Sequence, residues 1–341
     1  MRMNNRPVAP ASPYSQDFAE LLGHIQQARQ HVFALANTAL VDLYWRIGQI
    51  LTHKVAQSAW GKGVVTELAR YIAEADPTLK GFSNKNLWRM KQFYETYQGD
   101  EKLAPLVREL PWTHNIVIFA RCKSADERMF YLLETIANKL SKRDLERQID
   151  AATFERSSLP TKLSPAARVL HPGIGDAFKD RYVLEFLGLP ETHSETDLQR
   201  ALVGHMRALI LELGKDFLFM SDQHRLQVGN QDFYIDLLFY HRGLSALVAF
   251  ELKIGQFKPE HLGQLNFYLE ALDRDVKKPF ENPSIGVLLC RDKDEEVVEY
   301  ALSRNLSPAL VAQYQLQLPD KKLLQARLHE LLARDTGMDD E

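Results

Sequence analysis

The sequence predicts an α/β protein made of a helical N-terminal half and a C-terminal mixed sheet flanked by helices. In the first 150 residues or so, apolar residues recur three and four apart, which is typical of helices. A segment rich in Pro, Gly and Ser follows, and short β-rich runs alternate with helical patterns beyond it. The later order, αβββαβ, is that of a sheet covered by helices. We therefore expect a helical domain over 15–156, a linker over 157–176 and an α/β domain over 177–341.

Composition excludes several classes of protein. The charged fraction of 26% and the hydrophobic fraction of 45% are ordinary for a globular chain of 341 residues. Apolar runs fall far short of the roughly 20 residues that span a bilayer, so no membrane partner is expected. Two cysteines cannot form a disulfide framework, and the N-terminus lacks an apolar signal core, so we expect a cytoplasmic protein. The net charge of −3 argues against a strongly basic nucleic-acid-binding protein, but it is a sum over the whole chain.

The helices of the N-terminal half can be assigned from apolar spacing and capping residues. Ser83 is a suitable N-cap for a helix that runs to Tyr97, after a break at Pro77. A helix, a break and a second helix are compatible with a helix-turn-helix or winged-helix arrangement. The other helices are expected over residues 18–38, 41–51, 64–74, 124–140 and 142–151.

The N-terminal half also carries a local excess of positive charge. The stretch from Lys54 to Lys91 contains seven basic and three acidic residues, a balance of +4. Cationic and amide side chains on one helix suit contacts with phosphates and bases. We expect Lys62, Lys85, Asn86 and Arg89 to bind nucleic acid; the alternative is an ordinary solvated helix face.

The C-terminal half predicts the elements of the sheet in order. A helix over 195–213 precedes three strands, over 217–221, 233–240 and 244–253. Pro259 is well placed to begin a helix that ends at Leu272. The remaining elements are a strand over 284–290, a helix over 294–303, a strand over 310–318 and a helix over 321–334.

Two carboxylates stand inside these apolar strands, where a charge is costly unless it is paired or bound to a metal. Asp236 lies in the second strand and Glu251 in the third, two residues before Lys253. If Arg242-Gly243 is a two-residue hairpin turn, Asp236 opposes Ala249 and Glu251 is its diagonal neighbour. The side chains of Asp236, Glu251 and Lys253 then converge on one face of the sheet.

This set suits metal-dependent hydrolysis of a phosphodiester. Asp236, Glu251 and the backbone carbonyl of Leu252 offer the oxygen ligands that Mg²⁺ or Mn²⁺ prefers. Lys253 could orient or deprotonate the attacking water, or neutralise a non-bridging oxygen. The alternative is a buried salt bridge between Lys253 and one carboxylate.

Longer strings around these residues resemble a known family. Asp236 with Glu251-Leu252-Lys253 matches the D…E-x-K pattern of the PDDEXK superfamily, and residues 232–242 and 250–259 resemble the YhcG-type family of PDDEXK nucleases. The resemblance covers nearly the whole chain and implies a restriction-endonuclease-like fold. It also implies that Glu212 lies near the metal and that Gln264 orients the substrate. For Glu212 the alternative is a solvated helix end, and Tyr268, four residues after Gln264, is as compatible with a core position.

Together these observations predict a magnesium-dependent endonuclease that hydrolyses nucleic acid, with DNA favoured over RNA, and whose helical half binds the substrate. The alternative is a non-catalytic DNA-binding or complex-forming protein that keeps the nuclease fold. A homodimer is compatible with cutting two strands by one site per chain.

Overall fold

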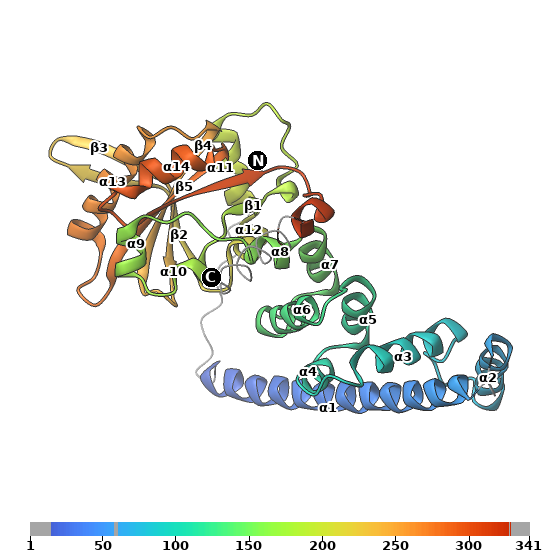
Figure 1. Cartoon of the computed structure of the whole chain (residues 1–341). Coiled ribbons are helices and arrows are strands. Elements are labelled where there is room, and N and C mark those ends of the chain that lie inside the picture. Colours follow the sequence, from blue (N-terminus) through green and yellow to red (C-terminus); the bar gives the residue numbers. More distant parts are fainter. Residues whose placement is uncertain (1–14, 58–60, 327, 329–341) are drawn as a thin grey trace. The chain divides into compact units, whose positions relative to one another are not determined.

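The fold is taken from a computed structural model, which describes residues 15–57, 61–326 and 328 (Figure 1). The chain forms two compact units that divide between Leu145 and Glu146. Each unit is described by itself below.

In the first unit, the described residues 15–57 and 61–145 form helices and contain no strand that could form a wing. Its longest element is α1 (Ser15–Ala56), beside which α3 and α4 lie in Figure 1. The expectation of two helices over 18–38 and 41–51 was wrong, because no Gly or Pro interrupts the chain between them. The other helices are α2 (Lys62–Ala75), α3 (Asn84–Tyr97), α4 (Leu103–Glu109), α5 (Trp112–Arg121), α6 (Ala125–Asn138) and α7 (Lys142–Asp150), the last of which crosses into the second unit.

The second half of α1 packs closely on α3. A Cβ atom on Gly48 would stand 2.8 Å from the carbonyl carbon of Met90, so glycine allows the two backbones to approach. Val41 and Leu51 of α1 are buried, as is Phe93 of α3. The predicted cap of α3 is confirmed, since the Ser83 hydroxyl accepts a hydrogen bond from the amide of Asn86.

The second unit contains a mixed sheet, as predicted, but with six strands rather than the expected five, because residues 181–183 add an edge strand. Its order is β1-β6-β5-β4-β3-β2, in which β1, β6, β5 and β4 are parallel neighbours and β4, β3 and β2 are antiparallel neighbours. The strands are β1 (Arg181–Val183), β2 (Phe217–Val228), β3 (Gln231–His241), β4 (Ala246–Gln256), β5 (Asn282–Asp292) and β6 (Ala309–Gln315).

Helices cover both faces of this sheet (Figure 1). Leu198 of α11 and Leu209 of α12 pack with Phe250 on one face, and Leu269 of α13 packs with Ala249 on the other. The predicted single helix over 195–213 is divided at His205, directly after Gly204. The helices are α11 (Glu195–Gly204), α12 (Met206–Leu213), α13 (His261–Ala271), the π-helix η2 (Leu272–Val276) and α14 (Glu295–Ser303).

The segment before the sheet carries short helices. Residues 157–176, expected as a linker, contain α9 (Pro165–Leu170) and most of α10 (Ile174–Ala177), and Ala167 belongs to the core of the sheet unit. They follow α8 (Thr153–Ser157) and precede β1 and the short 3-10 helix η1 (Glu185–Leu187). The domain limits drawn from composition stay a prediction.

The turn between β3 and β4 differs from the expected one. His241 pairs with Ala246, so the turn has four residues, Arg242 to Ser245, rather than two. Each residue of β3 therefore opposes a residue of β4 two positions further along than predicted. Because a shift of two preserves the alternation of faces, the relation between the two strands' side chains is kept.

No helix in the described part of the chain is long and apolar enough to cross a membrane.

Candidate active site

The site begins where β3 and β4 separate. Their ladder ends at the pair Leu237–Phe250, so Asp236 is the first residue of β3 beyond it. The Asp236 carboxylate accepts a hydrogen bond from the Leu252 amide, with 2.9 Å between Oδ2 and the nitrogen. This bond satisfies the Leu252 amide, which lies beyond the last pair of the β3–β4 ladder. Burial raises the pKa of Asp236, against the opposing effects of the Leu252 amide and Lys253.

Glu251 is a buried carboxylate with one oxygen unsatisfied. Only 3% of the residue is exposed, and its Oε1 accepts a hydrogen bond of 2.8 Å from the Lys253 ammonium. Its Oε2 is buried and has no hydrogen-bond partner among the described residues. Burial, and then the charge of Asp236, raise the pKa of Glu251 to about 7.

Lys253 links two carboxylates. Its ammonium nitrogen lies 2.8 Å from Oε1 of Glu251 and 3.8 Å from Oε2 of Glu195. Burial tends to lower the pKa of Lys253, but the hydrogen bond and charge of Glu251, with the charges of Glu195 and Asp236, raise it above its ordinary value. Lys253 is therefore a cation at neutral pH, and Asp236, Glu251 and Lys253 converge as expected.

Glu195 was not among the predicted site residues, although a helix was expected to begin at this position. It occupies the first turn of α11, where Ser194 and Asp197 form a capping box. The Ser194-x-x-Asp197 spacing before an apolar run marks this helix start, but it gives no sign that Glu195 faces Lys253. One turn later, the Gln199 amide donates a hydrogen bond of 3.2 Å to the carbonyl oxygen of Asp236, which fixes α11 beside β3.

Amide side chains surround the carboxylates. The Nε2 of Gln223 donates to Oδ1 of Asp236 at 3.1 Å, and Gln223 itself has a left-handed backbone with φ of 43°. The Nε2 of Gln264 donates to the hydroxyl of Tyr268 at 2.7 Å. Tyr268 is buried in the core between α13 and the sheet, yet the charges of Glu251 and Asp236 reach its hydroxyl. The predicted Gln264 therefore lies on the helix face that looks toward the carboxylates.

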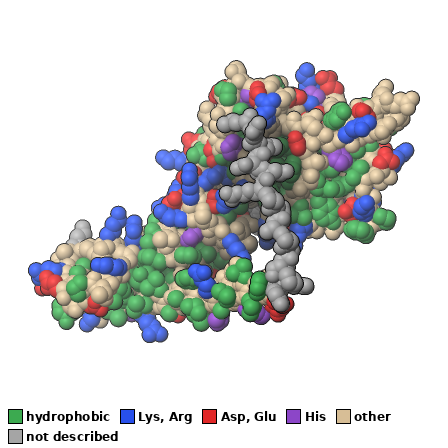
Figure 2. Space-filling view, turned by 180° about the vertical axis from the view of Figure 1, so that it is seen from behind, with side chains coloured by type: hydrophobic (Ala, Val, Ile, Leu, Met, Phe, Trp, Pro, Cys, Tyr) green, Lys and Arg blue, Asp and Glu red, His purple; other side chains and the backbone are tan. Residues whose placement is uncertain are grey.

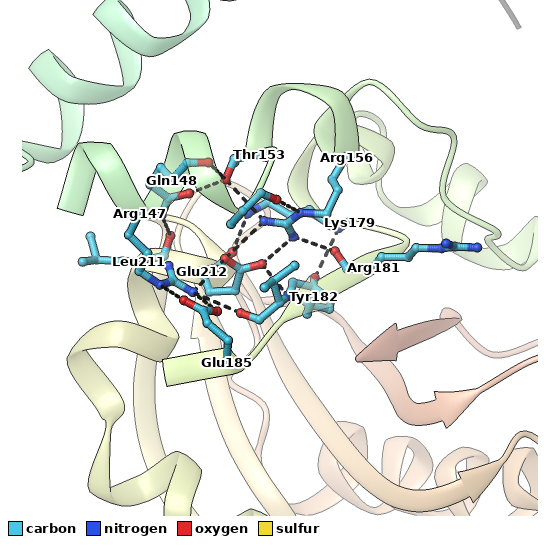
Figure 3. A network of polar contacts seen from close by, with 12 residues as sticks. Arg147, Gln148, Thr153, Arg156, Lys179, Arg181, Tyr182, Glu185, Leu211 and Glu212 are labelled. Atoms are coloured by element: carbon cyan, nitrogen blue, oxygen red, sulfur yellow. Dashed lines mark hydrogen bonds and ion pairs between the residues drawn. The ribbon is translucent and has the colours of Figure 1, made fainter. Parts of the chain in front are cut away.

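Glu212 is held elsewhere, in a buried network of charges (Figure 3). Its Oε1 accepts bonds from the Arg156 guanidinium at 2.5 Å and from the amide of Val183 at 2.9 Å. Arg147 lies 3.6 Å from its Oε2 and also pairs with Glu185. Burial alone would raise the pKa of Glu212, but these guanidinium groups and Lys179 hold it at about 2. The structure does not bring Glu212 together with Asp236 and Glu251.

The donor set can be compared with what a divalent cation needs. The described residues contain no group of three or more His, Cys, Asp or Glu side chains that could hold a metal ion. Two carboxylates converge, however, and the free Oε2 of buried Glu251 is an oxygen that lacks a positive or hydrogen-bonding partner. Hard oxygen ligands completed by backbone carbonyl and water suit Mg²⁺ or Mn²⁺, so the residues fit such an ion.

The expected nucleic-acid contacts on α3 have different local surroundings. Lys85 is exposed and Arg89, one turn later, is half-buried. Asn86 is engaged within the protein: its Oδ1 accepts a bond of 2.9 Å from the Trp112 indole, and its amide donates to the carbonyl of Gly81. The side chain of Lys62 lies outside the described residues.

Both halves of the chain match known protein families. Residues 175–329 match the YhcG PDDEXK nuclease domain, and residues 20–156 match the DUF1016 N-terminal domain. The chain is also 31% identical to the "Putative nuclease YhcG" of Escherichia coli strain K12 over 350 aligned positions, which cover 91% of this chain and 92% of that protein. The chain belongs to the YhcG family of PDDEXK nucleases.

Membership of the YhcG family makes this a chain of nuclease type, and nucleases hydrolyse nucleic acid. PDDEXK nucleases generally use divalent metal ions. A crystal structure of a repair endonuclease from Pyrococcus abyssi aligns with 38% of this chain and 49% of its own, at 14% identity and a TM-score of 0.26. That likeness is too low to support any conclusion.

Proposed function

We propose that the protein is a metal-dependent endonuclease that cuts DNA with Asp236, Glu251 and Lys253. The observation that carries the proposal is the unsatisfied Oε2 of buried Glu251 beside a second, half-buried carboxylate, that of Asp236, and a lysine. A carboxylate buried in this way costs several kcal/mol unless a cation compensates it. A structural salt bridge would use the lysine alone and would not leave this oxygen bare.

Asp236, Glu251 and the carbonyl of Leu252 would hold Mg²⁺ or Mn²⁺. When bound, the ion would supply Lewis-acid stabilisation of the negative charge that develops on the phosphate and would favour hydroxide over water. Lys253, kept cationic by Glu251 and Glu195, neutralises a non-bridging phosphate oxygen in this proposal. Its raised pKa makes it a poor general base at neutral pH, so the electrostatic role is preferred.

Three neighbours take supporting roles. Gln264 orients the substrate from α13, and Gln223 fixes the Asp236 carboxylate through its hydrogen bond. Glu195, rather than Glu212, is the helix residue whose carboxylate lies near the site. Glu195 is 3.8 Å from the Lys253 ammonium, whereas Glu212 is bound to Arg156.

We propose that the helical unit binds the substrate through Lys85, Arg89 and Lys62. Lys85 and Arg89 are four residues apart on α3, hence on one side of it. The wide major groove of B-form DNA admits a helix, whereas the major groove of A-form RNA is deep and narrow, which favours DNA. Asn86 is left out because both ends of its amide are occupied.

The test is cleavage by the purified full chain. Wild type is compared with Glu251→Ala and Lys253→Ala, in Mg²⁺, Mn²⁺ or EDTA, on linear, nicked, branched and single-stranded DNA and on RNA. Exposed Glu296 on α14 provides a control substitution, Glu296→Ala. We expect cleavage only with metal, lost in both site variants by about 100-fold or more and kept in the control. Equal cleavage by wild type and both site variants would refute the site.

A further inference from the structure

The first half of α1 carries an exposed row of apolar side chains. Every residue from 17 to 36 is exposed. Seven large apolar residues in this stretch are between 53% and 65% exposed: Phe18, Leu21, Leu22, Ile25, Val32, Phe33 and Leu35. Figure 2 shows hydrophobic side chains along this helix among the charged ones. Residues 17–36 are therefore an apolar helix surface of a kind that monomers seldom leave in water.

The spacing of these residues is a heptad repeat. Leu21, Ala28 and Leu35 are spaced seven residues apart. Ile25 and Val32 are also seven residues apart, and each follows a member of the first set, Leu21 or Ala28, by four residues. These are the d and a positions of a coiled-coil seam, and Leu22 lies directly beside it. Glycine and glutamine, at positions 23 and 30, stand on the outer side of the helix. The pattern favours a second helix as the partner rather than a sheet or a loop.

The size of the surface suits a dimer. Twenty residues of helix extend about 30 Å. Seven large apolar residues that are each more than half exposed present on the order of several hundred Å² of apolar area, which approaches the roughly 800 Å² that each partner buries in a stable dimer.

We propose that a second copy of this chain covers the surface, with the two α1 helices antiparallel. In that orientation Leu21 meets Val32 of the second copy, and Ile25 meets Ala28 of the second copy, in layers that repeat symmetrically. A large residue thus faces a small one at the centre of the seam. A parallel pair would set Ala28 against Ala28 and leave a void in that layer.

The first experiment measures the oligomeric state of the full chain, and it does not depend on nuclease activity. Sedimentation velocity over a range of concentrations should give a dimer for wild type. Ile25→Glu places a charge in the seam and should weaken self-association at least ten-fold, whereas Gln30→Glu adds the same charge on the outer side and should not. A wild-type monomer at all concentrations, or an Ile25→Glu dimer as tight as wild type, would overturn the proposal.

The second experiment tests the orientation by disulfide formation. Both natural cysteines, Cys122 and Cys290, are buried, so the background should be low. A mixture of Leu21→Cys and Val32→Cys chains should link to each other under mild oxidation. Self-linking of Leu21→Cys alone, without links in the mixture, would overturn the antiparallel register.

Discussion

The carboxylate of Asp236 accepts a hydrogen bond from the main-chain amide of Leu252, the residue that separates Glu251 from Lys253. One bond therefore ties the end of the β3–β4 ladder to both functional positions of β4. The Asp236 carboxylate accepts a main-chain hydrogen bond just beyond the last β3–β4 pair, and it also lies beside Glu251. A substitution here should be judged by its effects on structure and on cation binding separately.

Asp236→Asn should weaken Mn²⁺ binding by about ten-fold or more, because it removes one of two carboxylate ligands while its carbonyl oxygen can still accept the Leu252 bond. Isothermal titration of the metal-free protein measures the affinity, and the melting temperature reports the fold. The matched variant Asp222→Asn removes the same charge from an exposed position of β2 and should bind as wild type does. Identical Mn²⁺ affinities for the two variants would contradict the assigned ligand.

Glu251→Gln should stabilise the metal-free protein, and more so as pH rises. The folded-state pKa of about 7 exceeds the ordinary value of 4.5, so the stability linked to Glu251 is fully present below about pH 4.5 and is lost as pH rises through 7. Glutamine cannot ionise, so the variant does not carry the free-energy cost of a buried, ionised carboxylate. The melting temperature of the variant relative to wild type, measured at several pH values, should increase by a few degrees between pH 5 and 8. A difference that stays flat with pH would exclude a raised pKa.

Glu212→Gln should destabilise the protein by about 3–5 kcal/mol, because it leaves the buried charge of Arg156 without its counter-ion. Denaturant unfolding at neutral pH checks the loss. The folded-state pKa of about 2 means that the stability due to Glu212 is present above about pH 4.5 and is lost as pH falls toward 2, so wild type and variant should converge in acid. Exposed Glu296→Gln should cost little at any pH. A Glu212→Gln variant that keeps its stability but loses cation affinity would indicate that Glu212 belongs to the metal site after all.

Lys85→Ala and Asn86→Ala should separate binding from folding on α3. Lys85→Ala should weaken DNA binding and reduce the slope of log affinity against log salt by about 1, at unchanged stability. Asn86→Ala should instead lower stability by about 1–3 kcal/mol, because it leaves the Trp112 indole without its acceptor. Titrations with labelled DNA at several salt concentrations, together with thermal melts, measure both. A salt slope unaffected by Lys85→Ala would remove Lys85 from the interface.

Two glycines of α1 should respond to alanine in opposite directions. A Cβ on Gly48 would overlap the backbone of Met90, so Gly48→Ala should cost about 1–3 kcal/mol or more. Nothing lies within 4 Å of a Cβ on Gly23, and Gly23→Ala should add about 0.5–1 kcal/mol by reducing the entropy of the unfolded chain. Thermal melts of the two variants test the close approach of α1 and α3. Equal melting temperatures would argue against it.

Local patterns predicted much of the fold. The helix cap at Ser83 and the alternation of side chains along β3 and β4 depend on residues that are close in the sequence. For that reason both could be predicted from the sequence. The side-chain convergence of Asp236 and Glu251 held even though the turn is two residues longer than expected, because strand alternation has a period of two. With a turn one residue longer, the same reasoning would have failed.

Interactions between distant residues could not be predicted in this way. Glu212 and Glu195 both lie near helix ends and look equivalent in the sequence. Their difference is set by Arg156, 56 residues before Glu212, and by Lys253, 58 residues after Glu195. Only the folded chain decides which carboxylate faces a guanidinium in the core and which one faces the lysine of β4.

The buried pair of Arg156 and Glu212 also bears on how the chain can be shortened. The nuclease-domain match begins at residue 175, but both arginines that neutralise Glu212 precede it, at positions 147 and 156. A fragment cut at 175 would retain the buried carboxylate and Lys179 but lose both guanidinium groups. Such a fragment should fail to fold or should precipitate on expression, whereas one that begins ahead of α7 retains the complete ion network.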